Sequence, residues 1–254
     1  IVERRYRGRI ADGLTQRSDR KIRPLGREED RGIWKLDSPR TPRPHAGHDL
    51  EKFERRPGVA LDKDPLALPD VGIKLGDRIG TLAWNTARHL ESWYGITGIG
   101  AIYHTLNPRL FEDQLIYIAN HAGDRMIFLD LSFVALAEKL SPHLHTVERY
   151  VIFTDAAHMP QTTLKNAIAY EDYINEVDGD FQWAAFDENT AAGMCYTSGT
   201  TGHPKGVVYS HRSNLLHAMS VMMPDSLSLS SRDTVMPVVP LFHANSWSLA
   251  FSAP

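Results

Sequence analysis

The sequence predicts an α/β fold, in which strands alternate with helices along the chain. Short apolar runs that favour strands recur between helical patterns of about ten residues, and a glycine- and threonine-rich loop links two expected strands. The hydrophobic content of 42% is ordinary for a globular chain, and 254 residues suffice for one large domain or two small ones. Such alternation favours parallel strands with crossover helices, so both faces of the sheet must be covered.

The expected elements begin near Val71. Strands are predicted at 78–84, 101–103, 125–129 and 150–153, because these runs are rich in apolar and β-branched residues. Helices are predicted at about 86–97, 111–121 and 132–140, where apolar residues recur at helical spacing. Asn85 is expected to cap the first helix, since its side chain accepts hydrogen bonds from free N–H groups.

The second half of the chain is predicted to be less regular. Residues 155–190 are polar and are expected to run over the surface, with a short helix near 170–176. Further strands are expected at 191–196, 207–209 and 234–238. The helix predicted at 214–223 carries apolar residues that are expected to serve packing alone: Leu215, Leu216, Ala218 and Met219.

Residues 1–70 differ in composition from residues 71–254, which divides the chain into two parts. Residues 1–60 carry thirteen Arg and three Lys against ten Asp and Glu, a net charge of about +6, while the whole chain has −3. Prolines recur and no periodicity appears, so an irregular segment is expected. The basic residues are interleaved with acidic ones and no recognition motif is present, so we expect no nucleic-acid partner.

Several classes of protein are not expected. No apolar run approaches the roughly 18 residues of a membrane span, so no integral membrane segment is predicted. One cysteine, Cys195, excludes an internal disulfide framework and fits a reducing compartment, so the cytoplasm is predicted; Cys195 itself is expected to be buried in a strand. No histidines stand at the spacing of a structural zinc site. The chain starts with Ile1 and stops at Pro254 without a cap, so both ends look cut.

The most informative stretch is YTSGTTGHPKG, from Tyr196 to Gly206. Its glycines let the backbone bend so that successive N–H groups point into one concavity, which attracts anions. Hydroxyl side chains add donors and Lys205 adds a mobile positive charge, so phosphate suits the loop best. The loop is not a Walker A sequence, because a strand-forming run, Val207-Val208-Tyr209, follows in place of a helix. The expected order is strand, phosphate loop, strand.

A simpler interpretation is that the loop is only a turn between two strands and Lys205 a solvated turn lysine. The full eleven-residue string favours the phosphate role, because it closely resembles the phosphate-binding signature of the adenylate-forming superfamily. That superfamily includes acyl-CoA synthetases, peptide-synthetase adenylation domains and luciferases. From about Gly72 onward, the order of features resembles the large N-terminal domain of fatty-acid and related acyl-CoA ligases, with mixed sheets flanked by helices.

The resemblance covers about 180 residues and includes two further pieces, GIKLGDRIGTLAWNTARHLESWYGITGIGAIYHTLNPRL and VVPLFHANSW. The family's C-terminal domain, with its catalytic lysine, is not found. The chain is therefore expected to be a fragment of a ligase, inactive when isolated.

The resemblance also implies roles for individual residues. Thr200 and Lys205 would act in catalysis, Lys205 by neutralising the leaving pyrophosphate, and Thr197 would lie near Mg²⁺. His243 would line the carboxylate end of an acyl pocket and act there in catalysis, while Trp247 would wall or gate an acyl tunnel. Simpler roles for these two are a hydrogen-bonded histidine at a strand end and a core tryptophan. The residues implied to hold the nucleotide are Thr197, Ser198, Gly199, Thr200, Thr201, Gly202, Lys205 and Gly206.

The implied reaction has two steps and uses ATP, Mg²⁺ and coenzyme A. A carboxylate attacks the α-phosphorus of ATP to give an acyl-adenylate and pyrophosphate, and the thiol of coenzyme A then displaces AMP. Both reactants of the first step are anions, so the protein must supply positive charge and oriented donors. The expected acid is a medium- or long-chain fatty acid. Two alternatives stay open: an aryl or amino acid as the substrate, and a catalytically silent nucleotide-binding module. The oligomeric state is open as well.

Overall fold

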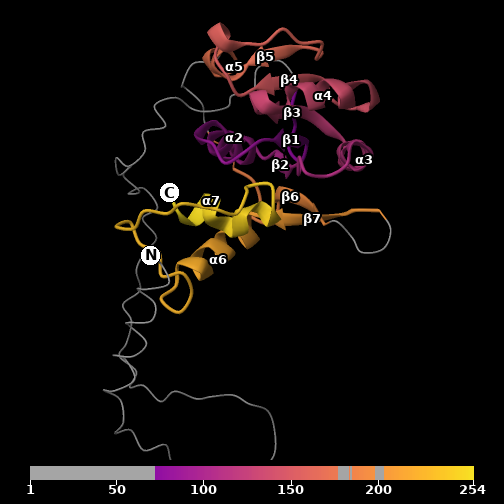
Figure 1. The fold of residues 1–254 in the computed structure, drawn as a ribbon. Helices are drawn as coiled ribbons and strands as arrows, with labels where there is room; N and C mark the ends of the chain where they lie inside the picture. The colour runs from indigo at the N-terminus through magenta and orange to yellow at the C-terminus, as the bar shows by residue number, and fades with distance from the viewer. Residues whose placement is uncertain (1–71, 177–182, 184, 198–202) are drawn as a thin grey trace, which may run out of the picture. The chain divides into compact units, whose positions relative to one another are not determined.

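The computed structural model describes residues 72–176, 183, 185–197 and 203–254. Seven strands form one sheet in the order β5-β4-β3-β1-β2-β6-β7 (Figure 1). The strands are β1 (Arg78–Leu82), β2 (Ile102–Thr105), β3 (Asp124–Leu129), β4 (Arg149–Ile152), β5 (Ala167–Ala169), β6 (Ala191–Thr197) and β7 (Lys205–Ser210). Residues 1–70 lie outside this part, so the irregular segment expected there stays a prediction.

The strand pairing confirms the predicted α/β class. Of the seven described strands, all neighbours from β5 to β6 are parallel, and β7 runs antiparallel to β6, which makes the sheet mixed. β5 was not predicted, because it lies in the polar segment that the sequence places on the surface. Only its pairing with β4, with Val151 opposite Ile168, makes it a strand.

Helices connect the parallel strands and cover both faces of the sheet (Figure 1). They are α2 (Ala87–Gly98), α3 (Glu112–Ala122), α4 (Val134–Leu140), α5 (Tyr170–Asn175), α6 (His211–Met222) and α7 (Leu249–Ser252). Short 3₁₀ turns lie at Leu131–Phe133, Ser141–His143, Ala156–His158 and Ala244–Ser248. Among the described helices, none combines the length and the apolar run that crossing a bilayer requires.

Two cores lie on opposite faces of the sheet, because successive side chains of a strand point to opposite sides. On one face, residues of α2, α5 and α7 pack with Met126 and Phe128 of β3. On the other, residues of α3 and α4 pack with Ile127 and Leu129 of the same strand. Both faces of the central strands are therefore covered, as the parallel pairing requires.

The centre of the first core is a stacked pair of large rings. The fully buried rings of Trp93 and Tyr103 lie 4.1 Å apart at 12°. Gly193 of β6 makes room for this pair, because a Cβ atom there would lie only 2.1 Å from Cζ of Tyr103. The glycine is thus required by close packing.

The prediction that Asn85 caps α2 is wrong. Thr86 holds the cap position, and its side chain accepts a hydrogen bond from the backbone N–H of His89 at 3.3 Å. Either residue type can cap a helix. Asn85 does not cap the helix because its side chain hydrogen-bonds to a backbone segment that is distant in sequence.

The strand predicted at 234–238 is also wrong, since these described residues form no ladder. The Asn85 amide donates to the carbonyls of Pro237 (3.1 Å) and Val239 (3.0 Å), and its oxygen accepts from the N–H of Leu241 (2.7 Å). One side chain thereby satisfies backbone groups that a neighbouring strand would otherwise bind. Pro237 and Pro240 further lack the N–H that a ladder needs.

The prediction that the apolar residues of α6 pack into the core is correct only for Ala218, which is 4% exposed. Leu215, Leu216 and Met219 are 61%, 49% and 53% exposed. The face of α6 that packs against the rest of the structure is a different one, and its buried residues are Asn214 and Ala218. Most of the apolar surface of α6 therefore faces away from the described residues.

Candidate functional site

Strands β6 and β7 form an antiparallel hairpin whose tip carries the glycine- and threonine-rich string. Tyr196 is the register partner of Gly206, and Thr197 is the partner of Lys205. The Thr197 hydroxyl lies 3.5 Å from the carbonyl oxygen of Lys205, to which it donates. The predicted strands on the two sides of the loop are confirmed, and the hairpin brings Thr197 and Lys205 together.

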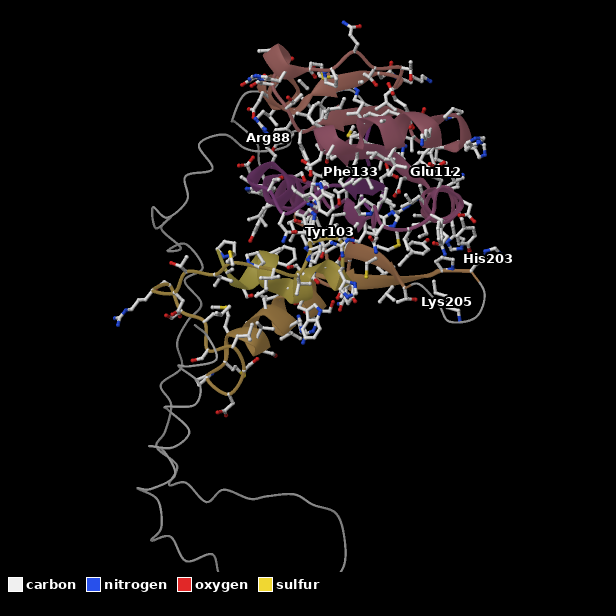
Figure 2. The ribbon with its side chains drawn as sticks, viewed as in Figure 1. Arg88, Tyr103, Glu112, Phe133, His203 and Lys205 are labelled. Atoms are coloured by element: carbon white, nitrogen blue, oxygen red, sulfur yellow. The ribbon has the colours of Figure 1, made fainter. Side chains whose placement is uncertain are left out.

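The five central residues of the loop lie outside the described part of the chain, so their phosphate-binding roles remain predictions: Ser198, Gly199, Thr200, Thr201 and Gly202. Thr197, Lys205 and Gly206 are described, and all three are exposed. Figure 2 shows Lys205 at the outer end of β7. An exposed ammonium group and hydroxyl at one tip are accessible to an anionic ligand.

Tyr196 forms the inner wall of the hairpin tip. Burial, together with the negative charge of Asp124, raises its pKa to about 12, so the phenol stays protonated at neutral pH. Gly206 lies directly against this ring, because a Cβ atom there would come within 3.2 Å of Tyr196 Cζ. Cys195, the neighbouring residue, is 5% exposed as predicted, and burial raises the pKa of its thiol.

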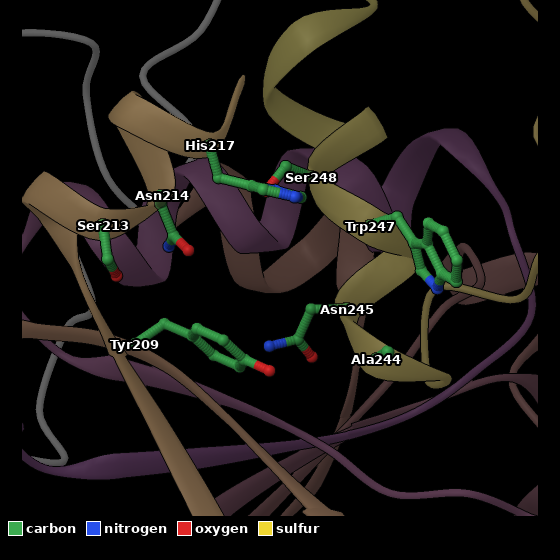
Figure 3. Close-up of a pocket in the computed structure, with 8 residues that line it drawn as sticks. All are labelled: Tyr209, Ser213, Asn214, His217, Ala244, Asn245, Trp247 and Ser248. Atoms are coloured by element: carbon green, nitrogen blue, oxygen red, sulfur yellow. The ribbon is translucent and has the colours of Figure 1, made fainter. Parts of the chain in front are cut away.

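A pocket of about 370 Å³ lies between β7, α6 and residues 244–248 (Figure 3). Tyr209 borders it from β7, four residues after Lys205, which corresponds to about 13 Å along the strand. One strand thus leads from the hairpin tip to the pocket. The lining residues are Tyr209, Ser213, Asn214, His217, Ala244, Asn245, Trp247 and Ser248.

Polar side chains at the pocket are held in fixed positions. His217 Nδ1 lies 2.7 Å from the hydroxyl of Ser248, and Thr105 donates to the amide oxygen of Asn245 at 3.0 Å. The amide nitrogen of Asn245 is buried and has no hydrogen-bond partner among the described residues. A buried donor of this kind is costly unless a ligand or water accepts from it. The pocket can therefore hold an oxygen-bearing ligand.

The two residues predicted for the acyl pocket differ in their placement. Trp247 lines the pocket and is 63% exposed. His243 is exposed and is not among the lining residues, although it directly precedes the pocket segment. The structure therefore brings Trp247, and not the His243 side chain, to the pocket wall.

The pocket segment has an unusual backbone. Residues 244–248 all have positive φ, between 46° and 59°, although none is glycine. Each such residue costs about 1–2 kcal/mol relative to the right-handed conformation. Backbone strain of this kind is concentrated at functional sites in proteins.

Sequence reasoning missed the polar lining from α6. Ser213, Asn214 and His217 stand at spacings that place them on one helix face. The sequence carries no clear signal for this lining, because a polar stripe is also the ordinary solvent face of an amphipathic helix.

The fold and the hairpin define an α/β protein with an anion-accessible hairpin tip and an adjacent pocket. The sequence profile of the AMP-binding enzyme family matches residues 66–254. The chain therefore belongs to the AMP-binding enzyme family, as the resemblance predicted.

Individual relatives agree with this assignment. The chain is 47% identical over 185 residues to the 3-methylmercaptopropionyl-CoA ligase of Ruegeria pomeroyi, covering 73% of this chain and 34% of the relative. It is 46% identical over 187 residues to the medium-chain-fatty-acid–CoA ligase of Ectopseudomonas oleovorans, covering 74% of this chain and 34% of the relative. The chain spans about a third of the length of the curated relatives it matches.

A solved structure shares the fold. The crystal structure of the anthranilate CoA ligase AuaEII in complex with anthranoyl-AMP matches with a TM-score of 0.56 and 26% sequence identity. The match covers 62% of this chain and 29% of that structure. The predicted fold class, part of the N-terminal domain of an adenylate-forming enzyme, is thus confirmed.

Proposed function

We propose that the chain forms the phosphate- and acid-binding part of an ATP-dependent, AMP-forming acid–CoA ligase, with a medium- or long-chain fatty acid as its substrate. The hairpin of β6 and β7 carries this proposal, because it presents Thr197 beside Lys205 at the two ends of the signature string. Two relatives at 46–47% identity are named as CoA ligases, which supports the reaction class.

In the first step, the fatty-acid carboxylate attacks the α-phosphorus of ATP, and the bond to the β-phosphate oxygen breaks to release pyrophosphate. Lys205 carries the positive charge that offsets the negative charge developing on pyrophosphate. The donors of Thr197 and of Ser198–Gly202 hold the β- and γ-phosphates, with Thr200 among them. In the second step, the thiol of coenzyme A displaces AMP and forms the thioester.

The described residues fit a Mg²⁺ ion that arrives with ATP better than a resident metal. Mg²⁺ in nucleotide sites is bound by one or two protein oxygens together with substrate phosphates and water. Thr197 offers one exposed hydroxyl of that kind at the hairpin tip. Among the described residues, no group of three His, Cys, Asp or Glu side chains gathers as a metal site.

We place the acid in the pocket between β7 and α6. The free amide donor of Asn245 suits a carboxylate oxygen. Trp247 forms an apolar wall for the chain of the acid. His243 directly precedes the pocket segment and does not line the pocket, so its expected contact with the carboxylate would require its side chain to turn toward the pocket when the acid binds. The single, buried cysteine suits a reducing compartment, so we place the enzyme in the cytoplasm.

A short thioether acid or an aryl acid is the second candidate substrate. The relative at 47% identity is named for 3-methylmercaptopropionate, and the solved neighbour at 26% is named for anthranilate. A pocket of about 370 Å³ lies near the lower end of typical ligand pockets, which favours the shorter acids.

A pyrophosphate-release assay decides between these acids. The protein is expressed from the complete reading frame that contains the chain and is supplied with ATP, Mg²⁺ and one acid at a time. Octanoate, decanoate and palmitate are compared with 3-methylmercaptopropionate, anthranilate and amino acids. Release that is fastest with the aliphatic fatty acids supports the proposal. ATP binding without release with any acid would indicate a silent nucleotide-binding module.

The role of Lys205 is tested in the same assay. We expect Lys205→Ala to lower the rate of adenylation by about 10²-fold or more, the size found when a charge-stabilising donor is removed from an active site. Thr200→Val should also lower the rate. Lys165→Ala is the matched control, because Lys165 is another exposed lysine on a turn remote from the hairpin in sequence. An unchanged rate in Lys205→Ala would remove the loop from the mechanism.

A further inference from the structure

The tip of the β6–β7 hairpin extends beyond the strand next to it. The pairing between β2 and β6 ends where Thr105 meets Cys195, whereas the pairing between β6 and β7 continues through Tyr196 and Thr197. At its tip, the hairpin is therefore a two-stranded ribbon, and such a ribbon is marginally stable alone in water. Its position must be fixed by contacts from outside the sheet.

Helix α3 supplies these contacts from one face. Tyr117 and His121 are four residues apart, so their side chains are neighbours on the helix surface. His121 Nδ1 lies 2.7 Å from the hydroxyl of Tyr196, and the Tyr117 ring stacks on the ring of His203 at 4.6 Å and 23°. Figure 2 shows His203 beside α3 at the hairpin end.

The two contacts hold the two ends of the phosphate loop. Tyr196 is the last residue but one before the undescribed stretch 198–202, and His203 is the first residue after it. The rings of Tyr117 and His121 also stack on each other at 5.3 Å. One helix face thus fixes both the entry and the exit of the loop.

The end of α3 that carries His121 is itself firmly held. Arg78 Nε donates to the carbonyl of Ala122 at 2.6 Å, and its Nη2 donates to that of Gly123 at 3.2 Å. Beneath Tyr196 lies the fully buried pair His104 and Asp124, whose side chains are 2.8 Å apart. The helix and the floor below the tyrosine form a fixed platform.

The bond between Tyr196 and His121 needs a hydrogen-bonding atom on each side. Burial raises the pKa of Tyr196 to about 12, so its hydroxyl stays protonated at neutral pH. A protonated hydroxyl can donate to an imidazole nitrogen or accept from one. A side chain without a hydrogen-bonding atom at the Nδ1 position cannot make this bond.

We propose that Tyr117 and His121 are positioning residues for nucleotide binding. They hold the two ends of the phosphate loop against α3, so that Thr197 and Lys205 face the phosphates in a fixed orientation. This inference rests on the proposed binding of ATP by the loop, and it assigns to the helix before β3 a role in that binding.

The test is the affinity of the full 254-residue chain for ATP with Mg²⁺, measured by isothermal titration calorimetry. His121→Leu removes the ring nitrogen that hydrogen-bonds to Tyr196 and should weaken binding about fivefold to tenfold, the value of one hydrogen bond. His121→Asn should restore most of the affinity, because the Asn amide can donate to the Tyr196 hydroxyl or accept from it. A merely structural role of the imidazole would not be rescued in this way.

A second pair of variants tests the stacking contact. Tyr117→Leu removes the ring that stacks on His203 and should also weaken ATP binding several-fold, whereas Tyr117→Phe keeps the ring and should bind as the unmodified chain. Glu112→Gln is the control on the same helix, because it alters only an exposed ion pair with Lys139. Equal affinity in His121→Leu, Tyr117→Leu and Glu112→Gln would overturn the inference.

Hydrogen exchange separates this inference from the proposed function. Without any nucleotide, the amides of Thr197 and Lys205 should exchange faster in His121→Leu and Tyr117→Leu than in the two conservative variants. If the unmodified chain does not bind ATP, the proposed function fails while this exchange pattern still reports the contact. If the chain binds ATP through Lys205 and neither exchange nor affinity changes in the variants, the positioning role alone is wrong.

Discussion

The sheet body, residues 78–176, and the C-terminal region, residues 205–254, differ in how they use apolar side chains. In the body, both faces of the central strands are covered, and large side chains such as Trp93 and Phe128 are completely buried. In the C-terminal region, Leu215, Met236 and Val238 are 61%, 81% and 81% exposed. The two regions therefore bury their large apolar side chains to different extents.

This difference shows that a hydrophobic pattern can predict a helix or strand without predicting which other part of the protein covers its apolar face. The body contains its own partners, since β1, β2, β3 and β5 are each followed by an α-helix that packs onto the sheet. The C-terminal region contributes the pocket and an exposed apolar face. Faces of this kind commonly mark interaction sites. We therefore expect the body to control folding stability and the C-terminal region to tolerate surface substitutions.

The largest expected effect is acid destabilisation of the body through His89. This histidine is fully buried in α2, and burial lowers its pKa from 6.5 to about 4. The folded chain keeps His89 neutral while the unfolded chain takes up a proton, so stability falls as the pH drops from about 6.5 to about 4. The loss can reach about 3 kcal/mol at pH 4. Urea unfolding at several pH values measures it.

The control is His89→Asn, which retains a donor for the carbonyl of Trp84 and has no titrating group. The free energy of unfolding of this variant should depend less on pH between about 4 and 6.5. Some dependence should persist, since burial also lowers the pKa of His211. The same pH dependence in both proteins would show that His89 does not control the acid stability of the body.

A smaller effect is expected at the connection between the two regions, where Asn85 binds the backbone of residues 237–241. Asn85→Ala removes three hydrogen bonds and should destabilise that segment locally by about 1–3 kcal/mol. Limited proteolysis within 233–240 should become about tenfold faster or more, with the urea midpoint of the body little changed. Asn85→Asp keeps the acceptor for Leu241 and loses both donors, so its rate of proteolysis should be at least partly raised above that of the unmodified chain. If the urea midpoint of the body fell together with the protease resistance of residues 233–240, the two regions would unfold as one unit.

Asn85 also shows where sequence reasoning ended. The alternating elements, the parallel pairing and the hairpin around the loop followed from local patterns, and the structure confirms them. The cap of α2 and the strand at 234–238 were both wrong because the Asn85 side chain pairs with backbone more than 150 residues away, and Pro237 adds a missing N–H in the second case. Local propensity contains no information about such a contact.

The candidate site divides in the same way. The string from Tyr196 to Gly206 identified the hairpin and the pair of Thr197 and Lys205, because its residue types are specific. The pocket residues Asn245 and His217 could not be located, since they meet only when α6 and the segment after Phe242 fold together. The contact of Tyr117 with His203 has the same origin, because α3 and the bend before β7 are far apart in sequence.

The smallest effect is expected on the outer face of α6. Leu215→Gln and Met219→Gln should change the free energy of unfolding by no more than about 0.5 kcal/mol, because both side chains are exposed and Gln is a good helix former. Ala218→Gln is the matched control on the same helix and should cost more, since Ala218 is buried. Binding of a hydrophobic dye should decrease in the first two variants. A loss above about 1 kcal/mol in Leu215→Gln or Met219→Gln would mean that the face is covered in solution, and that the two regions use their apolar residues alike.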